Sequence, residues 1–192
     1  GVDPEEIDTV LVSHFHSDHI NGLRMKDGAL AFPNATISAP QIEWDYWMDD
    51  ARMNAAPESA RGAFMHARRV FAPIAGDVRK FDGTVEVAPG VTAMPTPGHA
   101  PGHTSFMIDA GGPRLFVVGD CCNNPLIFAR RPEFQLAYDM DQELATETRK
   151  KVLAMAAQEK VPLVFYHAPF PAVGTVTREG DGYIWKEASL PG

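Results

Sequence analysis

Short apolar runs and amphipathic stretches alternate along the whole chain. The apolar runs have the length and the β-branched character of strands, and Pro-Gly or Gly-Gly pairs separate many of them. The segments predicted as strands are 9–12, 35–39, 84–87, 91–95, 105–109, 115–118 and 163–166. The pattern also predicts a hairpin near the end of the chain, with strands 173–178 and 183–187 around Gly180-Asp181-Gly182.

Three stretches are predicted as helices, and Pro40 and Pro57 open two of them. They cover 40–50, 57–71 and 141–159. For the last helix, Asp139 and Gln142 are expected to form a capping pair, and the run Arg149-Lys150-Lys151 is expected on a solvated face. Its buried face is expected to hold Leu144, Val152, Met155 and Ala156. The mixture of strands and helices predicts an α/β or α+β protein built in layers.

The sequence of 192 residues shows no linker-like segment, so we expect a single domain over 1–192. With 45% hydrophobic residues and a formal net charge of −8, it lacks the concentrated positive charge that nucleic-acid binding requires. No apolar run reaches the roughly 18 residues that a membrane span needs. We therefore expect a soluble protein that binds neither nucleic acid nor membranes. The pattern does not distinguish the periplasm from the cytoplasm, so the localisation stays unknown.

Residue types that bind metals gather directly after the first predicted strand. They are His14, His16, Asp18 and His19, within six residues. Because side chains of an extended chain alternate, His14 and His16 are expected to face one metal ion together. A turn would then direct Asp18 and His19 towards a neighbouring position. Imidazole nitrogen and carboxylate oxygen suit zinc, and also manganese, iron or cobalt.

Further residues of this kind lie at the ends of predicted strands. They are His99 and His103 in the segment 96–104, Asp120 after the strand 115–118, and His167 after the strand 163–166. Strand ends are where α/β proteins place their chemistry. A lone Asp or His there is more often structural, so the ordered combination carries the argument. The adjacent Cys121 and Cys122 rarely meet disulfide geometry, and a thiolate ligand is disfavoured because other ligands are already numerous.

The order of these motifs, His-x-His-x-Asp-His, Thr-Pro-Gly-His, Gly-Asp and a final His, resembles the metallo-β-lactamase superfamily over nearly the whole chain. The resemblance implies an αβ/βα four-layer sandwich and two divalent metal ions, with zinc as the first choice. It implies that one metal is held by His14, His16 and His99, and the other by Asp18, His19 and His167. Asp120 would bridge the two metals, and His103 would only pack behind them.

A binuclear site of this kind implies a hydrolase. Two divalent ions about 3.5–4 Å apart can share a water and lower its pKa towards about 7, which makes a bridging hydroxide available to attack an ester-type bond. Asp120 would stay ionised between the cations, and Asp18 would orient the hydroxide with its second oxygen. Asp18 and Asp120 are therefore the predicted catalytic residues.

Within the superfamily, the sequence is most similar to the methyl parathion hydrolase-like group. The similarity lies in Phe32-Pro33-Asn34-Ala35, in Gln41-x-Glu43-x-Asp45-x-Trp47 and in His167-x-x-Phe170-Pro171-x-x-Gly174. The group implies phosphotriesters, aryl esters or lactones as small-molecule substrates, and aromatic residues around the leaving group. Trp47 matches one of these aromatics and a second aligns at Ala63 or Phe64. Trp47 and Phe64 are therefore predicted in the substrate pocket, although Trp47 fits an ordinary helix anchor equally well.

Other functions stay open at this point. A β-lactamase or a thioesterase of the same superfamily would use the same ligands, although no Lys or Arg directly follows Asp120 and only 25 residues follow His167. Some acyl-homoserine lactonases carry a tyrosine three residues after the bridging aspartate, where this chain has Asn123. A catalytically silent metal-binding relative that acts as an interaction module normally shows a broken ligand set, and this set is intact.

Only 13 residues precede His14, whereas the superfamily has an N-terminal half with its own sheet and helices before this motif. We therefore expect mainly the C-terminal portion of the fold, with every ligand present and the first sheet nearly absent. A soluble monomer rarely tolerates a wide apolar face left open in this way. A companion N-terminal segment or the partner in a homodimer is expected to cover it.

Overall fold

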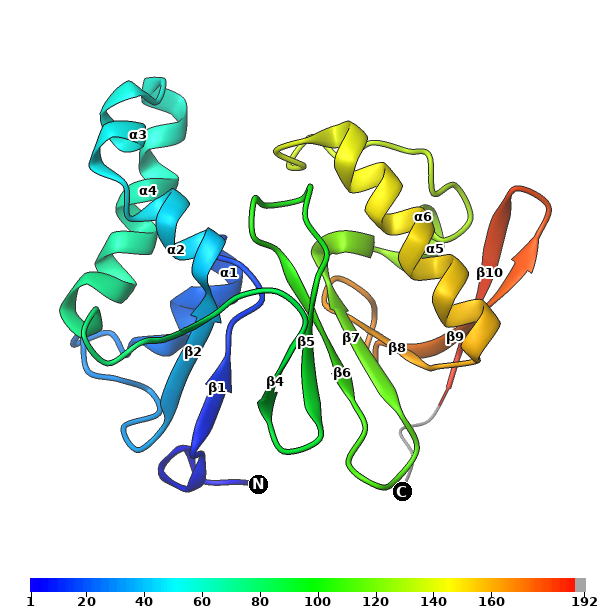
Figure 1. Ribbon diagram of the computed structural model, residues 1–192, viewed down its shortest axis with the longest axis horizontal. Helices are drawn as coiled ribbons and strands as arrows, with labels where there is room; N and C mark the ends of the chain where they lie inside the picture. The colour runs from blue at the N-terminus through cyan, green and yellow to red at the C-terminus, as the bar shows by residue number, and fades with distance from the viewer. Residues whose placement is uncertain (189–192) are drawn as a thin grey trace. The chain divides into compact units, whose positions relative to one another are not determined.

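The computed structural model of the protein describes residues 1–188 (Figure 1). The chain forms two compact units, Gly1–Asp82 and Gly83–Gly192. Each unit has its own sheet and its own apolar core. Within the described residues, no helix is long and apolar enough to cross a membrane. The single domain expected over 1–192 stays a prediction.

The first unit is built on a short parallel sheet. Its strands, in spatial order, are β1 (Thr9–Leu11), β2 (Thr36–Pro40) and β3 (Arg79–Phe81). Its helices are η1 (Pro4–Glu6), α1 (Ser17–Ile20), η2 (Asn21–Leu23), α2 (Gln41–Trp47), α3 (Asp50–Ala55), α4 (Glu58–Phe71) and η3 (Ala72–Ile74). Ile37 of β2 and Phe71 of α4 belong to one buried apolar cluster, so helices and sheet share a core. We expected the first sheet to be nearly absent, whereas the structure has three of its strands.

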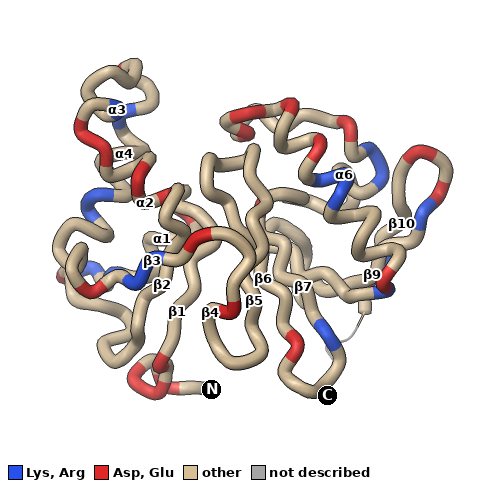
Figure 2. The backbone as a smooth tube through the Cα atoms, in the orientation of Figure 1, with Lys and Arg blue, Asp and Glu red and all other residues tan. Residues whose placement is uncertain are grey.

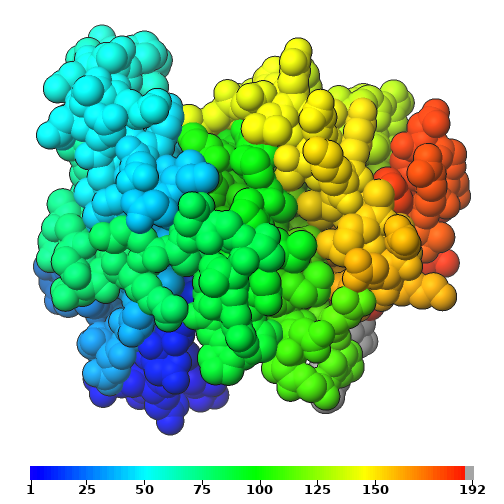
Figure 3. Space-filling view, viewed as in Figure 1, coloured from blue at the N-terminus to red at the C-terminus, as the bar shows by residue number. Residues whose placement is uncertain are grey.

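The second unit is built on a seven-stranded sheet. In spatial order its strands are β10 (Gly182–Glu187), β9 (Val173–Glu179), β8 (Leu163–Phe165), β7 (Leu115–Gly119), β6 (Thr104–Ile108), β5 (Val91–Pro95) and β4 (Val85–Ala88). Its helices are η4 (Asp120–Cys122), α5 (Pro125–Phe128) and α6 (Gln142–Glu159). The parallel pair β7–β8 requires a crossover, which α6 supplies (Figure 1). Leu153 of α6 and Phe116 of β7 share the core, and α6, yellow to orange, covers this part of the sheet in Figure 3.

The predicted strands, the final hairpin and the helices over 57–71 and 141–159 are confirmed, with their ends shifted by about one residue. The helix predicted over 40–50 ends earlier than expected, because α2 stops at Trp47. The carboxylate of Asp49 accepts hydrogen bonds from the backbone amides of Ala51 and Arg52. Asp49 therefore caps a second helix, α3, which begins shortly after α2 ends. Strand β3 was not predicted, because Arg79 and Lys80 give it no apolar alternation.

Three predictions about α6 are wrong. Asp141 takes the capping role that we predicted for Asp139, since its carboxylate accepts the amide of Leu144 at 3.0 Å. Leu144 itself is 37% exposed, whereas we expected it on the buried face. Arg149, expected in solvent, is fully buried together with Thr148. Figure 2 shows acidic residues gathered around the beginning of α6, where the helix dipole favours negative charge.

Candidate metal centre

In the first unit, the loop between β1 and α1 carries the first histidine motif. The ring centroids of His14 and His16 lie 4.7 Å apart, and those of His14 and His19 lie 4.1 Å apart. The expected turn after His16 is the beginning of α1, which brings Asp18 Oδ2 to 3.4 Å from His19 Nε2. His14 is buried and Asp18 is exposed, so the four side chains extend from the core of the unit to its surface.

A buried carboxylate anchors this loop from behind. Glu43 of α2 is fully buried, and its Oε2 accepts the backbone amide of Phe15 at 2.9 Å and the indole N–H of Trp47 at 2.8 Å. The ring of Phe15 stacks on Phe71 at 4.2 Å, so Phe15 is a core residue as predicted. We did not assign a role to Glu43 from the sequence, although it stands in the Gln41-x-Glu43 motif that carries the family resemblance. Two hydrogen bonds offset the cost of burying its polar oxygen.

The two predicted pocket residues lie together in the apolar cluster of the first unit. Trp47 and Phe64 are each 3% exposed, and their ring centroids are 4.8 Å apart. The Trp47 ring also meets His16 edge to face at 6.2 Å. Trp47 is therefore both a packing residue and a neighbour of a predicted ligand, and its role in a substrate pocket stays a prediction.

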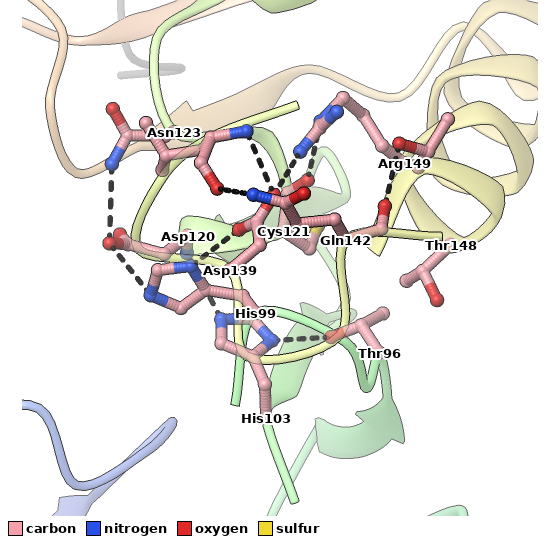
Figure 4. Close-up of polar contacts among 12 residues, drawn as sticks. Thr96, His99, His103, Asp120, Cys121, Asn123, Asp139, Gln142, Thr148 and Arg149 are labelled. Carbon is pink, nitrogen blue, oxygen red and sulfur yellow. Dashed lines mark hydrogen bonds and ion pairs between the residues drawn. The ribbon is translucent and has the colours of Figure 1, made fainter. Parts of the chain in front are cut away.

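In the second unit, Asp120 is the centre of a polar cluster (Figure 4). Its Oδ2 lies 3.4 Å from His99 Nε2 and 3.1 Å from His167 Nε2, and it accepts a hydrogen bond from Asn123 Nδ2 at 3.3 Å. Asp120 directly follows β7, and His167 comes shortly after β8, as the strand-end argument predicted. Tyr166, which we expected as the last residue of the strand 163–166, lies beyond the end of β8 and is 52% exposed.

Glycines shape the turns that present these side chains. Gly98 has a φ of +124°, and a Cβ there would overlap the backbone of Ala145 at the beginning of α6. Only glycine lets the His99 turn pack this closely against the helix. Gly119, with a φ of 55°, makes the sharp bend that turns the chain out of β7 at Asp120.

The geometry separates His99 from His103, the two histidines of the Pro-Gly-His repeat. The backbone amide of Asp120 donates to His103 Nε2 at 3.0 Å, and His103 Nδ1 lies 2.8 Å from the hydroxyl of Thr96. Both ring nitrogens of His103 are therefore engaged with the protein, as a residue that packs behind the ligands would be. His99 instead directs Nε2 towards Asp120 and Nδ1 towards Asp139 Oδ1, which is 2.9 Å away.

The two cysteines beside Asp120 are buried thiols. Burial raises the pKa of Cys121 to about 12, and burial also raises the pKa of Cys122. The thiolate, which is the form that binds metals, is therefore disfavoured at neutral pH in the protein alone. Imidazole nitrogens and carboxylates are the donors that these turns present, and this donor set fits a divalent ion such as zinc.

Comparison with known proteins agrees with this donor set. The profile described as the Metallo-beta-lactamase superfamily matches residues 1–167. An N-acyl homoserine lactonase of a Bacillus species is 29% identical over 168 residues, which cover 86% of this chain and 57% of the lactonase. A solved structure of the hydrolase AbOPH in the beta lactamase superfamily has a TM-score of 0.91 and 29% identity, and covers 100% of this chain and 68% of its own. The dizinc quorum-quenching lactonase AidC, solved with the product N-hexanoyl-L-homoserine, has a TM-score of 0.89 and 28% identity over the same shares.

The protein belongs to the metallo-β-lactamase superfamily, and its mixed α/β fold is the fold of that family. The chain spans a little over half the length of the Bacillus lactonase that it matches.

Proposed function

We propose that the protein is a binuclear metal-dependent hydrolase that opens lactones or closely related esters. The ligands are those that the motifs predict: His14, His16 and His99 for one ion, Asp18, His19 and His167 for the other, and Asp120 for both. The observation that carries the proposal is the cluster in which Asp120 Oδ2 faces the Nε2 atoms of His99 and His167. One buried imidazole, His99, and one exposed imidazole, His167, directed at one buried carboxylate form an arrangement typical of a metal centre.

The protein's own groups have separate tasks in this reaction. When bound, the two ions would supply an activated water and polarise the ester carbonyl. Asp120 is 3% exposed, and its Oδ2 lies between His99 and His167. The same oxygen accepts a hydrogen bond from the side-chain amide of Asn123. Asp18 is exposed and has its Oδ2 near His19, so it remains accessible to a substrate or a water at the surface of its unit.

We prefer lactones as the substrate class because the similar proteins are named as lactonases. The Bacillus relative is named for the hydrolysis of N-acyl homoserine lactones, and AidC was solved with the ring-opened product of such a compound. A phosphotriester is the second candidate, on the strength of the Phe32-Pro33-Asn34-Ala35 and Glu43-to-Trp47 motifs shared with the methyl parathion hydrolase-like group. Zinc is the proposed metal, as in the dizinc neighbour.

The proposal predicts the metal content and the substrate order of the purified protein. After loading with zinc, elemental analysis is expected to find about two metal ions per chain, since seven ligands suffice for two sites. A panel of N-acyl homoserine lactones, aryl esters, paraoxon-like triesters and β-lactams is expected to show the highest kcat/KM with the lactones. Less than one metal per chain contradicts the metal centre, and a triester preferred over every lactone replaces the first candidate by the second.

The aromatic pair makes a second prediction. Trp47→Ala is expected to reduce turnover of aryl esters and triesters more than turnover of small aliphatic lactones, because an aryl leaving group gains most from an aromatic wall. It should also lower the free energy of unfolding by about 3–5 kcal/mol, since a buried tryptophan is removed. The matched control is Trp44→Ala on the same helix, where the ring packs on Phe15 and Phe71 and should not discriminate between substrates. Equal losses on both substrate classes for Trp47→Ala mean that Trp47 only packs.

A further inference from the structure

Asp139 lies behind the His99 ring, opposite Asp120 (Figure 4). Its Oδ1 is 2.9 Å from His99 Nδ1, while the Nε2 atom of the same ring is 3.4 Å from Asp120 Oδ2. The side chain of Asp139 is fully buried and that of His99 is 2% exposed, so water does not compete for this contact. The two residues are 40 positions apart in the sequence, and the motif analysis gave Asp139 only a capping role.

We infer that Asp139 is a positioning residue that fixes His99 as the Nδ1–H tautomer, so that Nε2 presents its lone pair to a metal ion. The inference rests on the metal-dependent function proposed above. The ring faces two carboxylates, which have only acceptor oxygens, and Asp139 is the nearer of them at 2.9 Å, against 3.4 Å for Asp120. We therefore assign the ring proton to Nδ1. A neutral imidazole has one proton, which leaves the other nitrogen available as a ligand.

The orientation of the Asp139 carboxylate is itself fixed by its other oxygen. Asp139 Oδ2 accepts a hydrogen bond from Arg149 Nη2 at 3.1 Å and one from the amide of Leu136 at 3.4 Å. Arg149 is held in place in turn, since its guanidinium also donates to the carbonyls of Cys121, Pro132 and Phe134. Rotation of the carboxylate would exchange chemically equal oxygens, so an acceptor faces His99 in either position.

This arrangement makes an amide at position 139 a sharp test. In Asp139→Asn the side chain keeps its size but has one oxygen and one NH₂ group. Arg149 Nη2 and the backbone amide of Leu136 both donate to the Oδ2 position. At the Oδ1 position the donor is His99 Nδ1. The oxygen is therefore expected to face Arg149 and the NH₂ group to face His99. An NH₂ donor requires an unprotonated Nδ1, which moves the ring proton to Nε2, the proposed ligand atom.

The experiment reads the tautomer directly. Long-range ¹H–¹⁵N spectra of the His99 ring are recorded on the metal-free protein at alkaline pH. The signals of His99 are assigned as those that disappear in His99→Gln. We expect the Nδ1–H form in the wild-type protein and the Nε2–H form in Asp139→Asn. Competition with a chromophoric chelator is expected to show zinc bound about 10–100-fold more weakly by Asp139→Asn than by the wild-type protein.

The matched control is Asp141→Asn. It removes the same charge from the same loop, but Asp141 only caps α6, and asparagine caps a helix equally well. Its His99 tautomer and zinc affinity should match the wild type. If Asp139 serves only to balance Arg149, Asp139→Asn is less stable to heat but keeps the Nδ1–H form, which overturns the inference.

Two further outcomes are decisive. If Asp139→Asn does not fold, the wild-type spectrum still decides, because an Nε2–H tautomer there overturns the inference and an Nδ1–H tautomer supports it. If the wild-type protein binds no zinc, the proposed function fails, whereas the tautomer change in Asp139→Asn still reports whether Asp139 sets the ring proton.

Discussion

Replacing Asp120 by alanine is expected to remove at least one metal ion per chain and nearly all hydrolytic activity. Asp120 is the residue that the motif assigns to both ions, and its Oδ2 lies 3.4 Å and 3.1 Å from the Nε2 atoms of His99 and His167. Loss of the carboxylate should also weaken the orientation of both imidazoles. We expect kcat/KM on a lactone to fall at least about a thousandfold, which corresponds to about 4 kcal/mol of transition-state stabilisation.

Elemental analysis and lactone turnover measure this effect, and two further variants interpret it. Asp181→Ala removes the same charge from an exposed turn between β9 and β10, and is expected to keep both metals and full activity. Asp120→Asn keeps the size of the side chain but not its charge, and is expected to lie between the wild type and Asp120→Ala. Full metal content and turnover in Asp120→Ala would show that the bridging position has been assigned to the wrong residue.

The secondary structure of this protein could be predicted because its patterns are local. Strand β7 is a continuous apolar run, and α4 repeats Phe64, Ala67 and Phe71 at helical spacing. Strand β3 could not be predicted in the same way, because Arg79 and Lys80 are exposed and only pairing with β2 makes this segment a strand. Local patterns therefore predict the elements whose own side chains form the core, and miss an element that a neighbour stabilises.

The same distinction divides the candidate site. His14, His16, Asp18 and His19 could be identified because they lie within six residues, and the structure keeps them together on the loop after β1 and the first turn of α1. Glu43 reaches Phe15 across 28 positions, and Asp139 reaches His99 across 40. No spacing rule connects residues so far apart, and a lone carboxylate in a sequence is more often a surface group or a cap. The residues that hold the candidate ligands in place therefore emerged only with the fold.

Arg149 shows how misleading a local pattern can be. In the run Arg149-Lys150-Lys151, all three residues carry positive charge, and a run of this kind on a helix usually faces solvent. Lys150 and Lys151 are exposed. Arg149, one position before Lys150, lies on the face of α6 that packs on the core, and its side chain is fully buried. It meets Asp139 and three backbone carbonyls, and its guanidinium lies 4.6 Å from the centre of the Phe128 ring. Five hydrogen-bond donors in a planar fork suit arginine to this position better than lysine.

Arg149→Met is accordingly expected to be among the most destabilising substitutions in the second unit. Methionine fills much of the space of the arginine stem, so the effect arises from the lost polar contacts rather than from a cavity. It leaves the buried carboxylate of Asp139 without its counter-ion, and it leaves the carbonyls of Cys121, Pro132 and Phe134 without their donor. Removal of one partner from a buried ion pair lowers the free energy of unfolding by about 3–5 kcal/mol.

Urea unfolding of Arg149→Met against Lys150→Met measures this difference within one helix. Lys150 is the exposed neighbour, so its replacement removes the same charge and is expected to change the free energy of unfolding by no more than about 0.5 kcal/mol. Equal stabilities of the two variants would mean that water satisfies Asp139 and the three carbonyls, which requires the loop over 132–139 to open. A large loss confined to Arg149→Met would instead show that the contacts of Arg149 with Asp139 and the three carbonyls stabilise the second unit.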